Sequence, residues 1–123
     1  MNEGTDVLDA ELTHLETLWD GRLGDAYRHY ATSAPPRLAL AAALVESGIV
    51  LHGLGSHLAS PGNLLLGDLC LARASRLVAE EAGRETQIGF ARAIERAATH
   101  AATGLGSASV RTLLTAVIEG RSP

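Results

Sequence analysis

The histidines are the first candidates to consider for metal or acid–base chemistry in this sequence. It contains five, and the two nearest, His52 and His57, are five residues apart. That spacing fits neither one helix face nor a zinc motif, and no H-E-x-x-H or C-x-x-C sequence is present. We therefore expect surface or interface imidazoles and no metal site in this chain. The other three lie in separate predicted elements: His14, His29 and His100.

Nucleophilic catalysis has equally little support. The single cysteine, Cys70, falls in the middle of a predicted helix on its apolar side, where cysteine usually packs as a small hydrophobic residue. No G-x-S-x-G motif is present, and Gly53 and Gly55 follow an apolar helix, which is not the setting of a dinucleotide-binding loop. All ten cationic side chains are arginine, which excludes lysine-based chemistry such as Schiff bases.

Glu46 is the one carboxylate expected in an apolar environment, because its helix has few other polar residues. A lone buried carboxylate is costly, so Glu46 should be neutral, paired or at a helix edge in water. An arginine such as Arg73 or Arg92 is a candidate partner, and the solvated edge is an equal alternative. A less favoured hypothesis is a small enzyme or ligand binder that uses Glu46 with His52 and His57.

Composition narrows the class of protein. We expect a single domain over residues 1–123, with 46% hydrophobic residues and a net charge of −4, which argues against disorder. Four aromatic residues and the lack of a basic field argue against a nucleic-acid binder. One cysteine allows no internal disulfide.

The longest apolar run has eight residues, against about 18 for a membrane span. Since the first residues are acidic, unlike a secretory signal, we expect a cytoplasmic protein that does not span a membrane.

The elements that position these residues are all predicted to be helical. Apolar residues recur at steps of three and four, and nothing alternates with the period of a strand. Pro35 and Pro36 mark the clearest break, and the second helix, apolar almost all round, is expected to be the central one. The sequence predicts an all-α bundle of about five helices: 6–30, with a break or kink near 20–24, then 36–54, 64–82, 85–103 and 110–119.

The third predicted helix has apolar residues on two sides. Cys70, Ala74 and Val78 share one side, which should face the core, while Leu65 and Leu69 lie among the polar residues of the other. The second apolar side therefore needs another helix or another chain. For the fourth predicted helix the residues expected to face inward are Ile88, Ala91, Ile94 (or Glu95) and Ala98.

The third helix also carries a resemblance. Its segment Leu-Leu-Leu-Gly-Asp-Leu-Cys-Leu-Ala-Arg-Ala, residues 64–74, is similar to the leucine-leucine-glycine-aspartate helix of trans-polyprenyl diphosphate synthases. The preceding Ala-Ala-Ala-Leu-Val-Glu, residues 41–46, resembles the helix that leads to the first aspartate-rich motif of that family. The resemblance covers roughly residues 35–103 and implies a reduced N-terminal part of the isoprenoid synthase fold.

The departures from that family concern its metal sites. Where the family carries its first aspartate-rich motif, this chain has a degenerate segment with Ser56, His57 and Ser60, and no acidic residue. The second aspartate-rich motif has no counterpart before the last residue of the sequence. Carboxylates are the groups that hold Mg²⁺ in such enzymes. The resemblance therefore implies that this chain has no catalytic residues, binds no cofactor and is not an enzyme by itself.

Some enzymes of this family consist of a catalytic large subunit and a short degenerate subunit. The chain resembles that non-catalytic small subunit, which supports the activity and product length of its partner, and Mg²⁺ would be held by the partner. In this hypothesis a heterodimer forms, with a homodimer possible when the partner is absent. The alternative is a small self-associating helical module unrelated to isoprenoid synthesis. The expected partner-binding residues are Leu65, Leu66, Gly67, Asp68, Leu69 and Arg73.

Overall fold

The computed structural model describes residues 21–52, 61–102 and 108–120, and all regular structure in these ranges is α-helical. The all-α prediction is confirmed, with five helices and no strand in the described ranges. Ser56, His57 and Ser60, which the sequence identified as a degenerate metal motif, lie outside the described residues. The predicted helical stretch before residue 21 also lies outside them. The helices are α2 (Arg22–Tyr30), α3 (Pro36–Leu51), α4 (Pro61–Glu81), α5 (Arg84–Ala102) and α6 (Ala108–Ile118).

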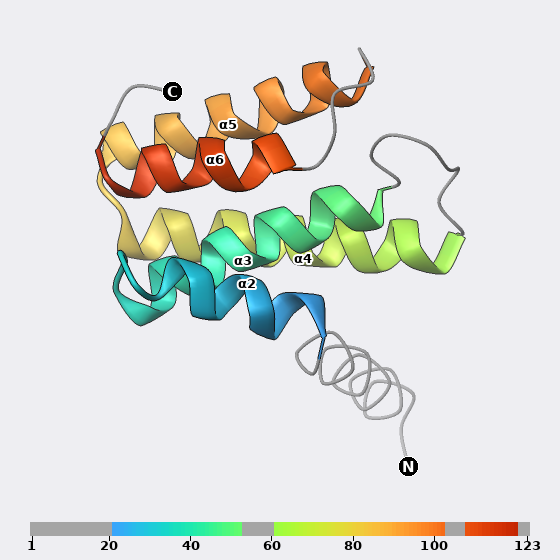
Figure 1. Cartoon of the computed structure of the whole chain (residues 1–123), viewed down its shortest axis with the longest axis horizontal. Helices are drawn as coiled ribbons and strands as arrows, with labels where there is room; N and C mark the ends of the chain where they lie inside the picture. Colours follow the sequence, from blue (N-terminus) through green and yellow to red (C-terminus); the bar gives the residue numbers. More distant parts are fainter. Residues whose placement is uncertain (1–20, 53–60, 103–107, 121–123) are drawn as a thin grey trace.

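The central element of the bundle is α3. It packs most extensively against α4 and α2, and it also contacts α5 and α6, which form a pair of their own (Figure 1). Every residue from Ala41 to Ile49 is buried, as expected for a helix without a polar face. The prediction that this helix is central is confirmed.

Proline and glycine set several helix ends. Pro36 occupies the start of α3, where its missing N–H is harmless and its fixed φ favours the helix. The last turn of α6 is followed by Gly120, whose φ of 75° is the left-handed conformation common after a helix C-terminus. At the other end of the described chain α2 begins after Gly21, within the stretch where a break was predicted.

The buried face of α5 differs from the predicted one. The prediction placed Ile88 in the core, but Ile88 is 40% exposed, and the buried positions are Phe90, Ala93 and Ala97. The close contact of α5 with α6 explains the rotation. A Cβ on Gly89 would lie 2.8 Å from Cγ1 of Val117, so the side of α5 that carries Gly89 faces α6. With this side against α6, the ring of the next residue, Phe90, is turned into the core. The face of α4 was predicted correctly, with Cys70, Ala74 and Val78 buried.

None of the described helices combines the length and apolar character required to cross a membrane.

Candidate functional site

Two glycines bring α3 and α4 into close contact. A Cβ on Gly67 would lie 2.5 Å from Cδ2 of His52 and 3.0 Å from the carbonyl oxygen of Gly48. A Cβ on Gly48 would in turn lie 2.8 Å from Cγ of Leu71. Side chains at either position would push the helices apart. Gly67, which was expected among the partner-binding residues, therefore packs against α3 of its own chain.

A contact between a histidine and a carboxylate flanks this crossing. Nε2 of His52, at the end of α3, lies 2.9 Å from Oδ1 of Asp68 on α4. The Asp68 side chain is 71% exposed, so the pair is mostly solvated and contributes little stability. The contact with Asp68 orients the His52 imidazole over Gly67, where the missing side chain leaves space for the ring.

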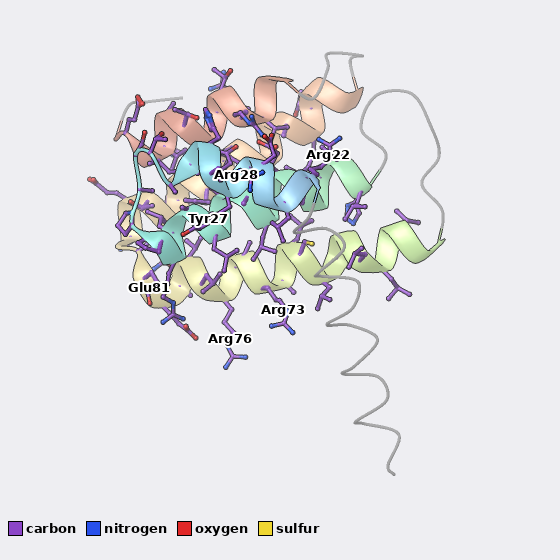
Figure 2. All side chains as sticks on the ribbon, turned by 60° about the horizontal axis from the view of Figure 1, so that its bottom comes forward. Arg22, Tyr27, Arg28, Arg73, Arg76 and Glu81 are labelled. Carbon is purple, nitrogen blue, oxygen red and sulfur yellow. The ribbon has the colours of Figure 1, made fainter. Side chains whose placement is uncertain are left out.

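The opposite side of α4 presents apolar side chains to solvent. Leu65 is 72% exposed, Leu69 is half-buried beside it, and Ala72 is exposed one turn further on. Arg73 and Arg76 continue this side and project from α4 in Figure 2. We refer to Leu65, Leu69, Ala72, Arg73 and Arg76 as the outward face of α4. Of the residues expected to bind a partner, Leu65, Leu69 and Arg73 belong to it, Asp68 lies at its edge, Leu66 is half-buried and Gly67 is turned to α3.

The buried carboxylate of Glu46 has three hydrogen-bond donors. The Tyr30 hydroxyl donates to Oε1 over 2.8 Å, and the Arg111 guanidinium donates through Nε to Oε1 over 2.9 Å and through Nη2 to Oε2 over 2.8 Å. Arg111 also reaches Oδ2 of Asp25 at 3.4 Å. Neither Arg73 nor Arg92, the suggested partners, takes part. Of the alternatives expected for Glu46, the structure shows a paired carboxylate and not a carboxylate at a helix edge in water.

This cluster is built to hold charge in place and not to move protons. Burial, reinforced by the charge of Glu46, raises the pKa of Tyr30 above its ordinary value, so its hydroxyl remains a donor. The hydrogen bond to Glu46 raises the pKa of Arg111. The carboxylate accepts three hydrogen bonds, and 6% of the Glu46 side chain is exposed. The cluster therefore joins α2, α3 and α6.

Cys70 is buried against α3 in the middle of α4. Burial raises the pKa of its thiol, with a smaller opposing effect from Arg73, so little thiolate forms at neutral pH. The expectation that Cys70 acts as a small hydrophobic residue is confirmed.

The two histidines whose side chains the structure describes, His29 and His52, do not converge. His29 contacts the Thr115 hydroxyl at 3.2 Å and His52 contacts Asp68, in different parts of the bundle. The hypothesis of a joint site at Glu46 and His52 is not supported, because the two side chains have separate partners. Across the described ranges no three His, Cys, Asp or Glu side chains are grouped closely enough to hold a metal ion.

A shallow apolar groove of about 200 Å³ runs between α4 and α5. Val45 of α3 contributes to its lining, Ala74 and Val78 come from α4, and Phe90 and Ile94 come from α5. Its lining is mainly apolar, and it is partly open to solvent.

The comparisons with known proteins add no name. No protein-family model, curated protein or solved structure matches the chain.

Arg111 is the residue that sequence reasoning missed, although a signal was available. In α6 (Ala-Ser-Val-Arg-Thr-Leu-Leu-Thr-Ala-Val-Ile) it is the only charged residue, just as Glu46 is the only acidic residue of α3. An apolar helix with a single acidic residue and a second apolar helix whose only charged residue is an arginine favour a buried pair between them.

Proposed function

We propose that the chain is the non-catalytic small subunit of a heteromeric polyprenyl diphosphate synthase. It supports the activity and product length of a catalytic large subunit and binds that subunit through the outward face of α4. The proposal combines the likeness of residues 64–74 to the family's glycine-aspartate helix with the exposure of that same helix.

The observation that carries the proposal is Leu65. With 72% of its surface exposed, it has the largest exposed fraction of the described large hydrophobic side chains, and Leu69 lies beside it on the same side of α4. Isolated exposed leucines are common, but a leucine pair on the motif-bearing helix is what an interface would cover. Arg73 adds a donor of the kind enriched in interfaces.

The proposal divides the reaction between the subunits. The large subunit would hold Mg²⁺ through its aspartate-rich motifs and stabilise the departing diphosphate. This chain forms part of the surface along which an isoprenoid product grows. The parts that line this surface are α4 and the apolar groove between α4 and α5. Glu46 and Arg111 support that surface by fixing α6 to α3.

Co-purification tests the interface. The chain is co-expressed with a full-length polyprenyl diphosphate synthase of the same organism and captured through a tag on the synthase. We expect co-purification, lost in Leu65→Glu because a buried carboxylate is costly. Ile88→Glu is the matched control, since Ile88 is an exposed isoleucine on α5 and its replacement should leave the complex intact.

The alternative function, a self-associating module, predicts different behaviour. In that case the chain sediments as a homodimer that Leu65→Glu dissociates, and the synthase captures neither form. Capture that is equal for wild type and Leu65→Glu would remove α4 as the binding surface.

A further inference from the structure

One stripe of α4 points directly away from the core. At about 100° per residue, five residues lie within about 40° of the direction opposite the buried side of the helix: Leu65, Asp68, Ala72, Arg76 and Ala79. All five are exposed, and the exposed fraction of the Arg76 side chain is 84%. In Figure 2 this arginine points away from the bundle. We refer to the five residues as the central stripe of α4.

The central stripe is symmetric about Ala72. Leu65 precedes Ala72 and Ala79 follows it by the same number of residues, which is about 10.5 Å along the helix in each direction. Asp68 and Arg76 likewise lie about 6 Å before and after it. A twofold axis beside Ala72 and perpendicular to the helix exchanges the two halves of the stripe. A second copy placed by this axis therefore presents its Leu65 to Ala79 and its Asp68 to Arg76.

We propose that two copies of this chain pair through the central stripes of their α4 helices, antiparallel and related by a twofold axis at Ala72. Asp68 of each copy forms an ion pair with Arg76 of the other. Leu65 of each copy packs on Ala79 of the other. The interface is isologous, so every contact occurs twice.

The sizes of the facing residues suit a close contact between two helices. Ala72, on the axis, carries only a methyl group, and a large residue faces a small one where Leu65 meets Ala79. Ala79 also borders the apolar groove between α4 and α5, together with Ser75 and Val78. Leu65, 72% exposed in one copy, would therefore leave water for a surface whose apolar part extends beyond Ala79.

The charged residues of the central stripe favour the antiparallel orientation. A parallel pair would place Asp68 opposite Asp68 and Arg76 opposite Arg76, whereas the antiparallel pair places opposite charges together. Both side chains are largely exposed, 71% for Asp68. Arg76 uses its Nε for Glu80 at 3.3 Å, and its guanidinium carries further N–H donors that point from the other two nitrogens.

The consequence for a synthase rests on the proposed function. The central stripe shares Leu65, Ala72 and Arg76 with the outward face of α4, so a homodimer and a complex with the large subunit exclude each other. Self-association then lowers the apparent affinity for the large subunit. The dimer itself needs no synthase, and its test stands whether or not the proposed function does. Capture by a synthase, and not self-association, distinguishes the proposed function from the self-associating module.

Charge reversal tests the pairing of Asp68 with Arg76. Sedimentation equilibrium of the purified chain gives the dissociation constant of the dimer. Asp68→Arg and Arg76→Asp each turn two attractions into two repulsions, so each should raise that constant about tenfold. Asp68→Arg/Arg76→Asp places opposite charges across the twofold axis again and should return the constant toward the wild-type value.

Matched controls separate charge pairing from other effects. Arg92→Asp and Glu95→Arg make the same two reversals at exposed residues of α5 and should leave the dissociation constant unchanged. Leu65→Ser should weaken the dimer without any change of charge. The contact of Asp68 with His52 is lost in Asp68→Arg and in the double variant alike, so recovery in the double variant does not come from it. Circular dichroism establishes that every variant keeps its helices.

Three results would overturn the proposal. The first is a wild-type chain that stays monomeric up to a concentration of about 1 mM. The second is a dimer that neither single reversal weakens. The third is a folded double variant that dissociates as readily as the single variants, because the twofold pairing requires the exchanged charges to restore the contact.

Discussion

The Glu46 carboxylate and the Arg111 guanidinium, 65 residues apart in the sequence, meet through two parallel hydrogen bonds of 2.8 and 2.9 Å. This bidentate geometry is the strongest arrangement of an arginine–carboxylate pair. It joins the central helix α3 to the last described helix α6. Because Tyr30 of α2 donates to the same carboxylate, three helices share one polar centre in an otherwise apolar core.

Removing one partner of this pair should cost more than removing both. Arg111→Met leaves the Glu46 carboxylate buried without its cation, which we expect to lower the free energy of unfolding by about 3–5 kcal/mol. In Glu46→Leu/Arg111→Met no buried charge remains, so the loss should be smaller than for Arg111→Met alone. Urea unfolding of the four proteins in this double-mutant cycle provides the measurement. Additive losses would contradict a coupled pair.

The Tyr30 hydroxyl should contribute to stability at neutral pH. Tyr30→Phe removes a donor from a buried carboxylate that keeps its arginine, and we expect a loss of about 1–2 kcal/mol. The comparison variant is Tyr27→Phe, since Tyr27 is a half-buried tyrosine on the same helix as Tyr30. Thermal unfolding of the two variants compares them directly.

Alkaline pH should destabilise the fold through two groups. The pKa values of Tyr30 and Cys70 are raised in the folded protein, mainly by burial, so the folded state holds their protons more tightly than the unfolded chain. Their contribution is complete below the ordinary pKa of each group, about 10 for Tyr and about 8.5 for Cys, and declines as pH rises above it. Each titrating group should lower the free energy of unfolding by up to about 1.4 kcal/mol per pH unit.

The absence of lysine makes this alkaline window simple to interpret, because arginine does not titrate there. Denaturant unfolding from pH 8 to 11 should show a falling stability whose slope above pH 10 is shallower in Tyr30→Phe. An identical slope in that variant would show that Tyr30 does not carry the effect.

The glycine crossing between α3 and α4 should be intolerant of a methyl group. Gly67→Ala introduces a Cβ at 2.5 Å from the His52 ring, and we expect a loss of about 1–3 kcal/mol from overpacking. Gly62→Ala is the matched control on the same helix, because a Cβ there meets nothing within 4 Å. It should be neutral or stabilising by up to about 1 kcal/mol through helix propensity. Equal effects of the two substitutions would argue against a tight crossing.

Much of the fold could be predicted because local signals agreed with the packing. Pro36 sets the start of α3, and the lack of a polar face on α3 identifies the centre of the bundle. The apolar arc of α4 through Cys70 and Ala74 likewise indicates its buried side.

Other features depend on contacts that no local pattern encodes. The inward face of α5 is set by Gly89 against Val117 of α6, a contact between helices, so the periodicity of α5 alone suggested the wrong side. Similarly, the sequence indicated that Glu46 needed a partner, but its choice of Arg111 follows from how α6 lies on α3. Gly67 was expected among the partner-binding residues, and only the packing shows that α3 is its neighbour.

The central claim is that this chain modifies a prenyl-transfer reaction catalysed by another subunit. The most direct measurement is the rate and product length of a full-length polyprenyl diphosphate synthase of the same organism, assayed with and without the purified chain. We predict a higher rate or a changed product length with wild type and with Ile88→Glu, and neither change with Leu65→Glu. Identical rates and products with and without the chain would contradict the account.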